Sequence, residues 1–202
     1  MIVTVDEIKT YLYGTTVPAS YDTLFTQLIN EVEAEIKSYT GVVIGNDTEY
    51  VSISNEVGDG ANVPVIRTRY KPVRTLTKIE VKDTDFNWVE NTDQDLSNID
   101  IDGSVIHTKS VYARGVMNLK FSYTAGYLTT EVPEDLKRCA IMMVISAFNK
   151  RESIGYNSQD VLDLSLAISN TTPIEIANIL EEYRGNYLEK NRIRVENAAA
   201  TY

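Results

Sequence analysis

Residues 119–148 read LKFSYTAGYLTTEVPEDLKRCAIMMVISAF and contain the change of period that decides the fold. Leu119, Phe121 and Tyr123 alternate with polar residues, which is typical of a strand with one buried face. Pro133 then opens a helix whose apolar residues leave almost no polar face before Asn149. We therefore expect a strand that leads into a central, buried helix.

Two further helices are predicted upstream of this stretch. Thr4 and Glu7 have the spacing of a capping box, which indicates a short helix that ends before Gly14. A second helix is expected from about Ser20 to a stop at Gly41, because apolar residues recur there every three or four positions. The other face of this helix is expected to carry three acids, Glu31, Glu33 and Glu35.

Between the second helix and the strand at 119–125, the apolar period is two. Alternating pairs include Val51 with Ile53 and Ile79 with Val81. The dipeptide Asp102-Gly103 is the strongest hairpin signal, because both turn positions tolerate positive φ. Residues 91–98 are polar and are expected to form a solvated loop.

A fourth helix is predicted from a second capping-box pattern, Thr172 with Glu175. Residues 153–171 are consistent either with a strand or with a docked loop. The expected fold class is α+β, a bundle of about four helices (two N-terminal, one central and buried, one C-terminal) with an antiparallel β region inserted between the second and third. One domain over 1–202 would comprise N-terminal helices (1–47), the β region (48–126), a helical core (127–188) and a docking tail (189–202).

The charge balance limits the possible partners. Twenty-nine acids against 19 bases give a net charge of -10, which argues against a protein that binds phosphate backbones. The longest apolar run, Cys139 to Ile145, is too short to span a bilayer, so no membrane partner is expected. A single cysteine cannot build a disulfide framework, and a reducing, intracellular origin is expected.

No motif of an enzyme is present. The chain has no phosphate-binding glycine loop, no metal-spaced Cys/His cluster and no Gly-x-Ser-x-Gly elbow. His107 has no nucleophile that the sequence pairs with it, and Cys139 lies in an apolar helix. Asn98, Asp100, Asp102 and Gly103 resemble the opening of a calcium loop, but Lys109 occupies the twelfth position, that of the bidentate glutamate. We predict no catalytic residue, metal ligand or cofactor; a small hydrolase with an unrecognised carboxylate pair is the enzyme alternative.

One basic stretch stands against the acidic background. It contains Arg67, Arg69, Lys71 and Arg74, of which the first three would share one face of a strand. The face is either simply solvated or an electrostatic seam that meets an acidic neighbour. Our hypothesis is that it meets Glu31, Glu33 and Glu35 of another copy, head to tail, which generates a ring if the rotation closes.

Five motifs occur in an order that resembles the head-tail connector (adaptor, head-completion) family of tailed bacteriophages. The resemblance spans residues 3 to about 188. The motifs are Val5–Leu12; Tyr21–Leu24 leading to Ile36–Gly41; Tyr70–Leu76 before Ile79–Val81; Leu119–Tyr127 followed by Val132–Lys137; and Asn149–Glu152 with Ile179–Arg184.

The resemblance implies a structural protein of the virion neck, assembled in the host cytoplasm. Its copies would form a ring, commonly dodecameric, that docks under the portal protein and presents its other side to a stopper or tail-completion protein. DNA would pass through the lumen without specific binding, and an acidic ring favours sliding because it repels the duplex. By position, the portal contact would fall on Tyr183, Arg184, Tyr187, Arg192, Arg194 and Tyr202. Another neck ring protein, such as a stopper, is the nearest alternative.

Overall fold

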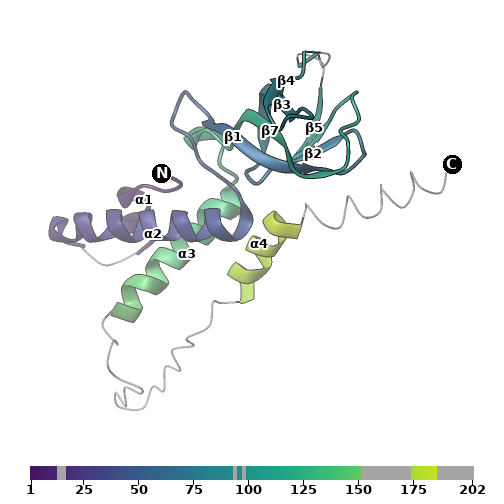
Figure 1. Ribbon diagram of the computed structural model, residues 1–202. Coiled ribbons are helices and arrows are strands. Elements are labelled where there is room, and N and C mark those ends of the chain that lie inside the picture. The colour runs from purple at the N-terminus through teal and green to yellow at the C-terminus, as the bar shows by residue number, and fades with distance from the viewer. Residues whose placement is uncertain (13–16, 93–94, 97–98, 152–173, 186–202) are drawn as a thin grey trace. The chain divides into compact units, whose positions relative to one another are not determined.

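The computed structural model describes residues 1–12, 17–92, 95–96, 99–151 and 174–185 (Figure 1). The predictions for 153–171 and for the tail after residue 188 lie outside these residues. Within the described ranges the protein is α+β, with four α-helices and two antiparallel sheets. The chain forms two compact units: Met1–Thr40 pairs with Val132–Arg184 in a helical unit, and Gly41–Glu131 forms a β unit.

The helical unit begins as the sequence predicts. Thr4 caps α1 (Val5–Tyr11) through a capping box in which its backbone N–H donates to Glu7 at 2.6 Å and its hydroxyl accepts from the Glu7 backbone N–H at 3.2 Å. A 3-10 turn, η1 (Ala19–Tyr21), leads into α2 (Asp22–Thr40). Gly41 follows α2 with a φ of 75°, which confirms the predicted stop.

Helices α2 and α3 (Glu134–Arg151) pack against each other through apolar stripes. The Phe148 ring of α3 lies with its centroid 4.9 Å from Phe25 and 5.7 Å from Tyr21. The last helix, α4 (Ile174–Gly185), buries Ile176 and Leu180. No helix in the described ranges is long and apolar enough to cross a membrane. The stripes consist of Phe25, Ile29, Val32 and Ile36 on α2, and Leu136, Cys139, Ala140, Met143 and Val144 on α3.

The β unit contains two antiparallel sheets. The larger has the order β1-β7-β3-β4 and the smaller the order β2-β6-β5. The predicted hairpin is confirmed, but its turn lies one residue later, because Asp102 belongs to β5 and pairs with Val105 of β6. The turn residues are Gly103, with a φ of 62°, and Ser104. A short 3-10 turn, η2 (Thr129–Glu131), ends the unit. The strands are β1 (Val51–Gly60), β2 (Val65–Arg67), β3 (Val73–Lys82), β4 (Trp88–Glu90), β5 (Asp100–Asp102), β6 (Val105–His107) and β7 (Gly115–Ala125).

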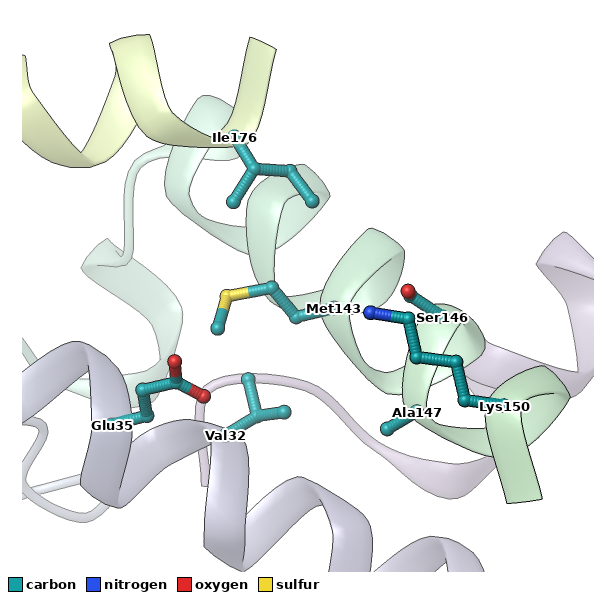
Figure 2. A pocket seen from close by; sticks show the side chains of 7 residues that line it. All are labelled: Val32, Glu35, Met143, Ser146, Ala147, Lys150 and Ile176. Carbon is teal, nitrogen blue, oxygen red and sulfur yellow. The ribbon is translucent and has the colours of Figure 1, made fainter. Parts of the chain in front are cut away.

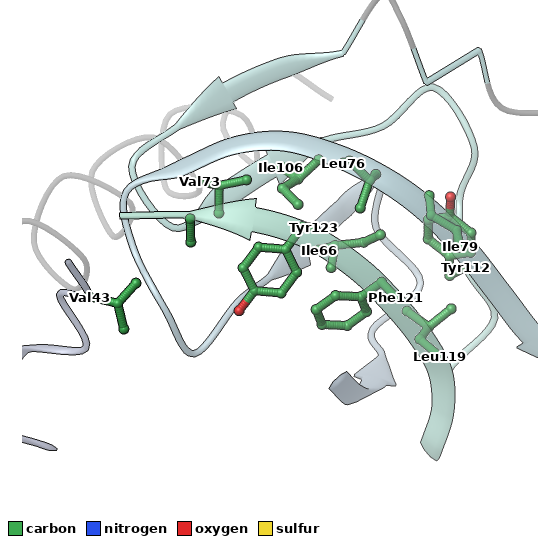
Figure 3. Packing of buried hydrophobic residues seen from close by; sticks show 11 residues of the cluster. Val43, Ile66, Val73, Leu76, Ile79, Ile106, Tyr112, Leu119, Phe121 and Tyr123 are labelled. Atoms are coloured by element: carbon green, nitrogen blue, oxygen red, sulfur yellow. The ribbon is translucent and has the colours of Figure 1, made fainter. Parts of the chain in front are cut away.

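Strand β7 is the centre of the β unit, because it pairs with β1 on one side and β3 on the other. Its inward residues Leu119, Phe121 and Tyr123 are at most 2% exposed, as their alternation predicts. Figure 3 shows these three side chains along β7 within the core. Both sheets contribute to that core, which consists of Val43, Ile66, Val73, Leu76, Ile79, Ile106, Tyr112, Leu119, Phe121, Tyr123 and Ala125.

A partly buried hydrogen-bond network joins the loop between β2 and β3 to this core. The Tyr123 hydroxyl donates to Glu56 Oε2 at 2.6 Å and accepts from the Tyr70 backbone N–H at 3.2 Å. Glu56 Oε1 accepts from the Arg69 backbone N–H at 2.7 Å. Burial, followed by the bond to Glu56, raises the pKa of Tyr123 far above its ordinary value, so the phenol stays protonated and remains a donor.

Replacing Tyr123 with phenylalanine removes that hydroxyl and leaves the other groups of the network in place. We expect Tyr123→Phe to lower the free energy of unfolding by about 1–3 kcal/mol, because Glu56 and the Tyr70 N–H each lose a partner. Urea unfolding measures this change. Tyr11→Phe, at a side chain 51% exposed, is the control and should change stability by less than about 0.5 kcal/mol. Equal effects of the two substitutions would contradict a role for the network.

Candidate assembly surfaces

The described residues contain no cluster with the chemistry of a catalytic or metal site. Among them, no group of three or more His, Cys, Asp or Glu side chains could hold a metal ion. Cys139 is fully buried, and burial, with smaller contributions from Asp135 and Glu35, raises the pKa of its thiol to about 11. A thiol in that environment is protonated and unreactive at neutral pH.

The three acids predicted on α2 do not share one face. Glu31 and Glu35 are exposed and one helical turn apart. Glu33 is half-buried, and its carboxylate lies 4.0 Å from the Met1 amino group. Two residues along a helix correspond to about 200° of rotation, which places Glu33 on the side opposite its two neighbours. The prediction of a single acidic face is thus wrong for Glu33.

The basic stretch is also not one strand face. Strand β2 ends at Arg67, and the chain then turns instead of continuing as a strand through Lys71. Arg67 and Arg69 are exposed, whereas Lys71 is buried and its burial lowers the pKa of its amine. Backbone bonds from Lys71 N–H to Gly41 O at 3.0 Å and from Val43 N–H to Lys71 O explain this, because they fix Lys71 beside the segment after α2. The prediction that Lys71 shares a surface with the two arginines is wrong.

Arg74 makes hydrogen bonds and an ion pair within the β unit. Its Nε donates to the Gly126 carbonyl at 2.8 Å, and its Nη2 lies 2.9 Å from a Glu131 carboxylate oxygen. The guanidinium carbon also lies 4.7 Å from the ring centroid of Tyr50 and 5.4 Å from that of Tyr127. Arg74 thereby joins the start of β3 to the turn after β7. Of the four predicted bases, only Arg67 and Arg69 present an exposed charge.

Two of the predicted portal-binding residues anchor α4 within the helical unit. Tyr183 donates its hydroxyl to Asp135 on α3 at 2.6 Å. Arg184 donates to Glu181 at 3.1 Å and to the Tyr39 hydroxyl at 3.3 Å, and its guanidinium lies 4.9 Å from the Tyr39 ring centroid. Tyr39 in turn donates to Glu181 at 2.5 Å. The other four predicted residues, Tyr187, Arg192, Arg194 and Tyr202, lie outside the described residues.

The Tyr39 contact was not predictable from the apolar period of the second helix, which does not show what lies opposite each side chain. Its ring is 41% exposed at the end of α2, where the hydroxyl reaches a helix 142 positions later. A tyrosine in the last turn of an amphipathic helix is the only signal in the sequence. The hydrogen bond from Tyr39, with the nearby Arg184 charge, lowers the pKa of Glu181.

A charged face of the larger sheet also escaped the sequence analysis. Glu80 lies 2.9 Å from Lys120 and 3.3 Å from Lys78, and the hydrogen bond from Lys120 is the main cause that lowers the pKa of Glu80. Trp88 lies between two amines. Its ring centroid is 5.0 Å from the Nζ atom of Lys82 and 4.8 Å from the Nζ atom of Lys120. Alternation predicts that such residues share a face, but only the strand register reveals which ones are neighbours.

Comparisons with known proteins agree with the order of elements. The model of a family described as head completion protein matches residues 1–185. A chain in the virion of a native gene transfer agent particle is 14% identical with a TM-score of 0.58, and the match covers 91% of this chain and 89% of the other. No curated protein matches.

Two further solved chains come from the necks of such particles. One, from the neck of an empty particle treated with C6 symmetry, is 14% identical with a TM-score of 0.54 and a coverage of 91% and 89%. The other, from the neck of a native particle treated with C12 symmetry, is 13% identical with a TM-score of 0.52 and a coverage of 89% and 87%. At these identities the likeness is one of fold.

The anchoring of α4 should depend on pH through Glu181. The pKa of Glu181 is lower in the folded protein than in the unfolded chain. The carboxylate therefore stabilises the anchor at any pH above its unfolded-state pKa, and this stabilisation is lost as the pH falls through its folded-state pKa. We expect the protection of α4 amides against hydrogen exchange to decrease below about pH 4, after correction for the intrinsic rate.

Two glutamine variants separate the effect of the Glu181 carboxyl on α4 from the general effect of acid on the protein. Glu181→Gln should have weaker α4 protection at neutral pH and a flatter acid dependence, because the amide carries no charge for Arg184. Glu182→Gln, at the next exposed position, should behave like the wild type. Identical profiles for the wild type and Glu181→Gln would show that the anchor does not depend on this ion pair.

Proposed function

The chain belongs to the head completion protein family, and from that membership we propose that it is the head-tail connector, or adaptor, of a tailed bacteriophage or related particle. It is a structural protein of the virion neck, not an enzyme. The single observation that carries the proposal is the family match over residues 1–185, which includes both the helical unit and the β unit.

The proposed assembly is a ring of about twelve copies. The support is the likeness of fold to chains in necks treated with C6 and C12 symmetry. In this proposal the ring docks under the portal protein, extends the DNA channel and offers its other side to a stopper or tail-completion protein. Assembly takes place in the host cytoplasm. The net charge of -10 supports a lumen that repels the duplex and lets it slide.

The exposed charges provide a seam between neighbouring copies. Arg67 and Arg69 of one copy would face Glu31 and Glu35 of the next, since all four side chains are exposed. The seam is supported only indirectly by Glu33, Lys71 and Arg74, whose local contacts hold the surrounding structure in place. A seam made from two different surfaces is heterologous, and rotation about an axis closes such contacts into a ring.

The C-terminal part of the chain is the proposed portal contact. Tyr183 and Arg184 hold α4 in place, and the residues that follow, Tyr187, Arg192, Arg194 and Tyr202, would bind the portal. In this account residues 1–202 act as one connector domain, its four helices work as a bundle, and 189–202 serve as a docking tail.

Particles produced without this chain test the proposed role. We expect heads that package DNA but carry no tails and lose their DNA, because the surface on which the tail docks is missing. Electron microscopy of purified particles measures the fraction with tails. In wild-type particles, the chain should form the first ring below the portal. Density for it one ring lower would assign it to the stopper position instead.

Charge reversal tests the seam. We expect Arg67→Glu with Arg69→Glu to abolish rings, because four exposed acids would then oppose one another across each contact. Adding Glu31→Arg and Glu35→Arg to the same chain should restore them, since the swap recreates opposite charges. Native mass spectrometry at low salt counts the copies. Rings that persist in the first variant, or a swap without rescue, would contradict the seam.

A further inference from the structure

One end of the larger sheet exposes apolar side chains on two adjacent turns. Register brings them together: β3 pairs Val81 with Leu119 of β7, so the β3–β4 turn lies beside the residues that precede Leu119. Phe86 in that turn is 80% exposed, and Val116 and Met117 at the start of β7 are 81% and 57% exposed. Nothing in the sequence pattern distinguishes these residues from those of an ordinary polar loop.

The backbone holds Phe86 and Met117 in a conformation that side chains rarely adopt. Their φ angles are 65° and 49°, in the left-handed region. The carboxylate of Asp83 accepts from the backbone N–H groups of Asp85 at 2.9 Å and Asn87 at 2.8 Å, and the Phe86 N–H donates to the Asp83 carbonyl at 3.2 Å. A bulky residue at such a position is a genuine outlier, and outliers of this kind cluster at functional sites.

The rigidity of the turn has a consequence for binding. A side chain whose backbone is already fixed loses less conformational freedom when it enters a partner. Large aromatic anchors that fill pockets also dominate the energy of protein interfaces. Phe86 combines both properties, and a pocket that holds one aromatic ring would accept its side chain.

The helical unit contains such a pocket (Figure 2). Its volume is about 170 Å³. The apolar part of its lining comes from Val32 on α2, Met143 and Ala147 on α3, and Ile176 on α4, and the polar part from Glu35, Ser146 and Lys150. A cavity of about 150 Å³ holds a benzene molecule, so the volume suffices for one aromatic ring. A thioether such as that of Met143 also makes favourable contacts with aromatic rings.

We propose that Phe86 of one copy inserts into this pocket of the neighbouring copy. The inference rests on the proposed ring and names a contact that would hold neighbours together. The two surfaces are different, which is what a ring built from heterologous contacts requires.

Paired cysteines test the contact directly. The full-length chain with Asp85→Cys and Ala147→Cys, which keeps Phe86, assembled as rings or in particles, should give after oxidation a covalent ladder from dimers up to the closed ring. Each single variant should give no ladder, because both cysteines are needed at one contact; the native Cys139 is buried. Ser54→Cys with Ala147→Cys is the matched control, since Ser54 is exposed in the middle of β1.

A second pair of variants separates folding from assembly. Glycine adopts positive φ freely, so Phe86→Gly should fold at least as stably as the wild type in urea. It should nevertheless need a concentration about tenfold higher or more to form rings, since the anchor is lost. Phe86→Tyr, which keeps the ring, should assemble nearly as the wild type does.

The outcomes distinguish this contact from the proposed connector function. Rings that form normally from Phe86→Gly, or double-cysteine rings without a ladder, would overturn the contact and leave the connector role intact. A cross-link confined to single chains would also overturn the contact and leave the connector role intact. A pocket filled by residues 152–173 of its own chain would have the same consequence. A wild-type chain that forms no ring even with its portal would overturn both proposals.

Discussion

The pairing of β7 with both β1 and β3 is the constraint on which the rest of the described structure depends. The strand places Leu119, Phe121 and Tyr123 in one core, and each of these side chains meets residues far away in the sequence. The Tyr123 hydroxyl then ties the loop after β2 to β1 through Glu56. Because the Tyr123 hydroxyl and the half-buried Glu56 carboxylate would lose these hydrogen bonds in another arrangement, the network favours the observed position of the loop.

The polar residues considered for assembly fall into two groups. Arg74, Glu33, Lys71, Tyr183 and Arg184 make local contacts that complete the two units. Arg67, Arg69, Glu31 and Glu35 remain exposed and are available to a neighbour. Exposed ion pairs contribute little singly, but a closed ring repeats each contact around its axis. A connector assembled in this way would gain specificity from charge and affinity from apolar anchors.

The proposed Phe86 contact fits that division. The β3–β4 turn is fixed by hydrogen bonds to Asp83 before any partner arrives, and the pocket between α2, α3 and α4 has space for an aromatic ring. Each copy would then offer one anchor and receive another. The same α4 that completes the pocket with Ile176 is anchored by Tyr39 and Asp135, so the C-terminal region and the contact between copies share one support.

The sequence by itself determined the local elements: the capping box at Thr4, the stop at Gly41, the hairpin at Gly103 and the period change between β7 and α3. These follow from interactions between residues close in the chain, and the order of motifs also indicated the family. Only the tertiary structure decided which charges are exposed, because Arg74 meets Glu131 across 57 positions and Tyr39 meets Glu181 across 142. The exposure of Phe86 beside Val116 likewise depends on strand register, which local periodicity does not encode.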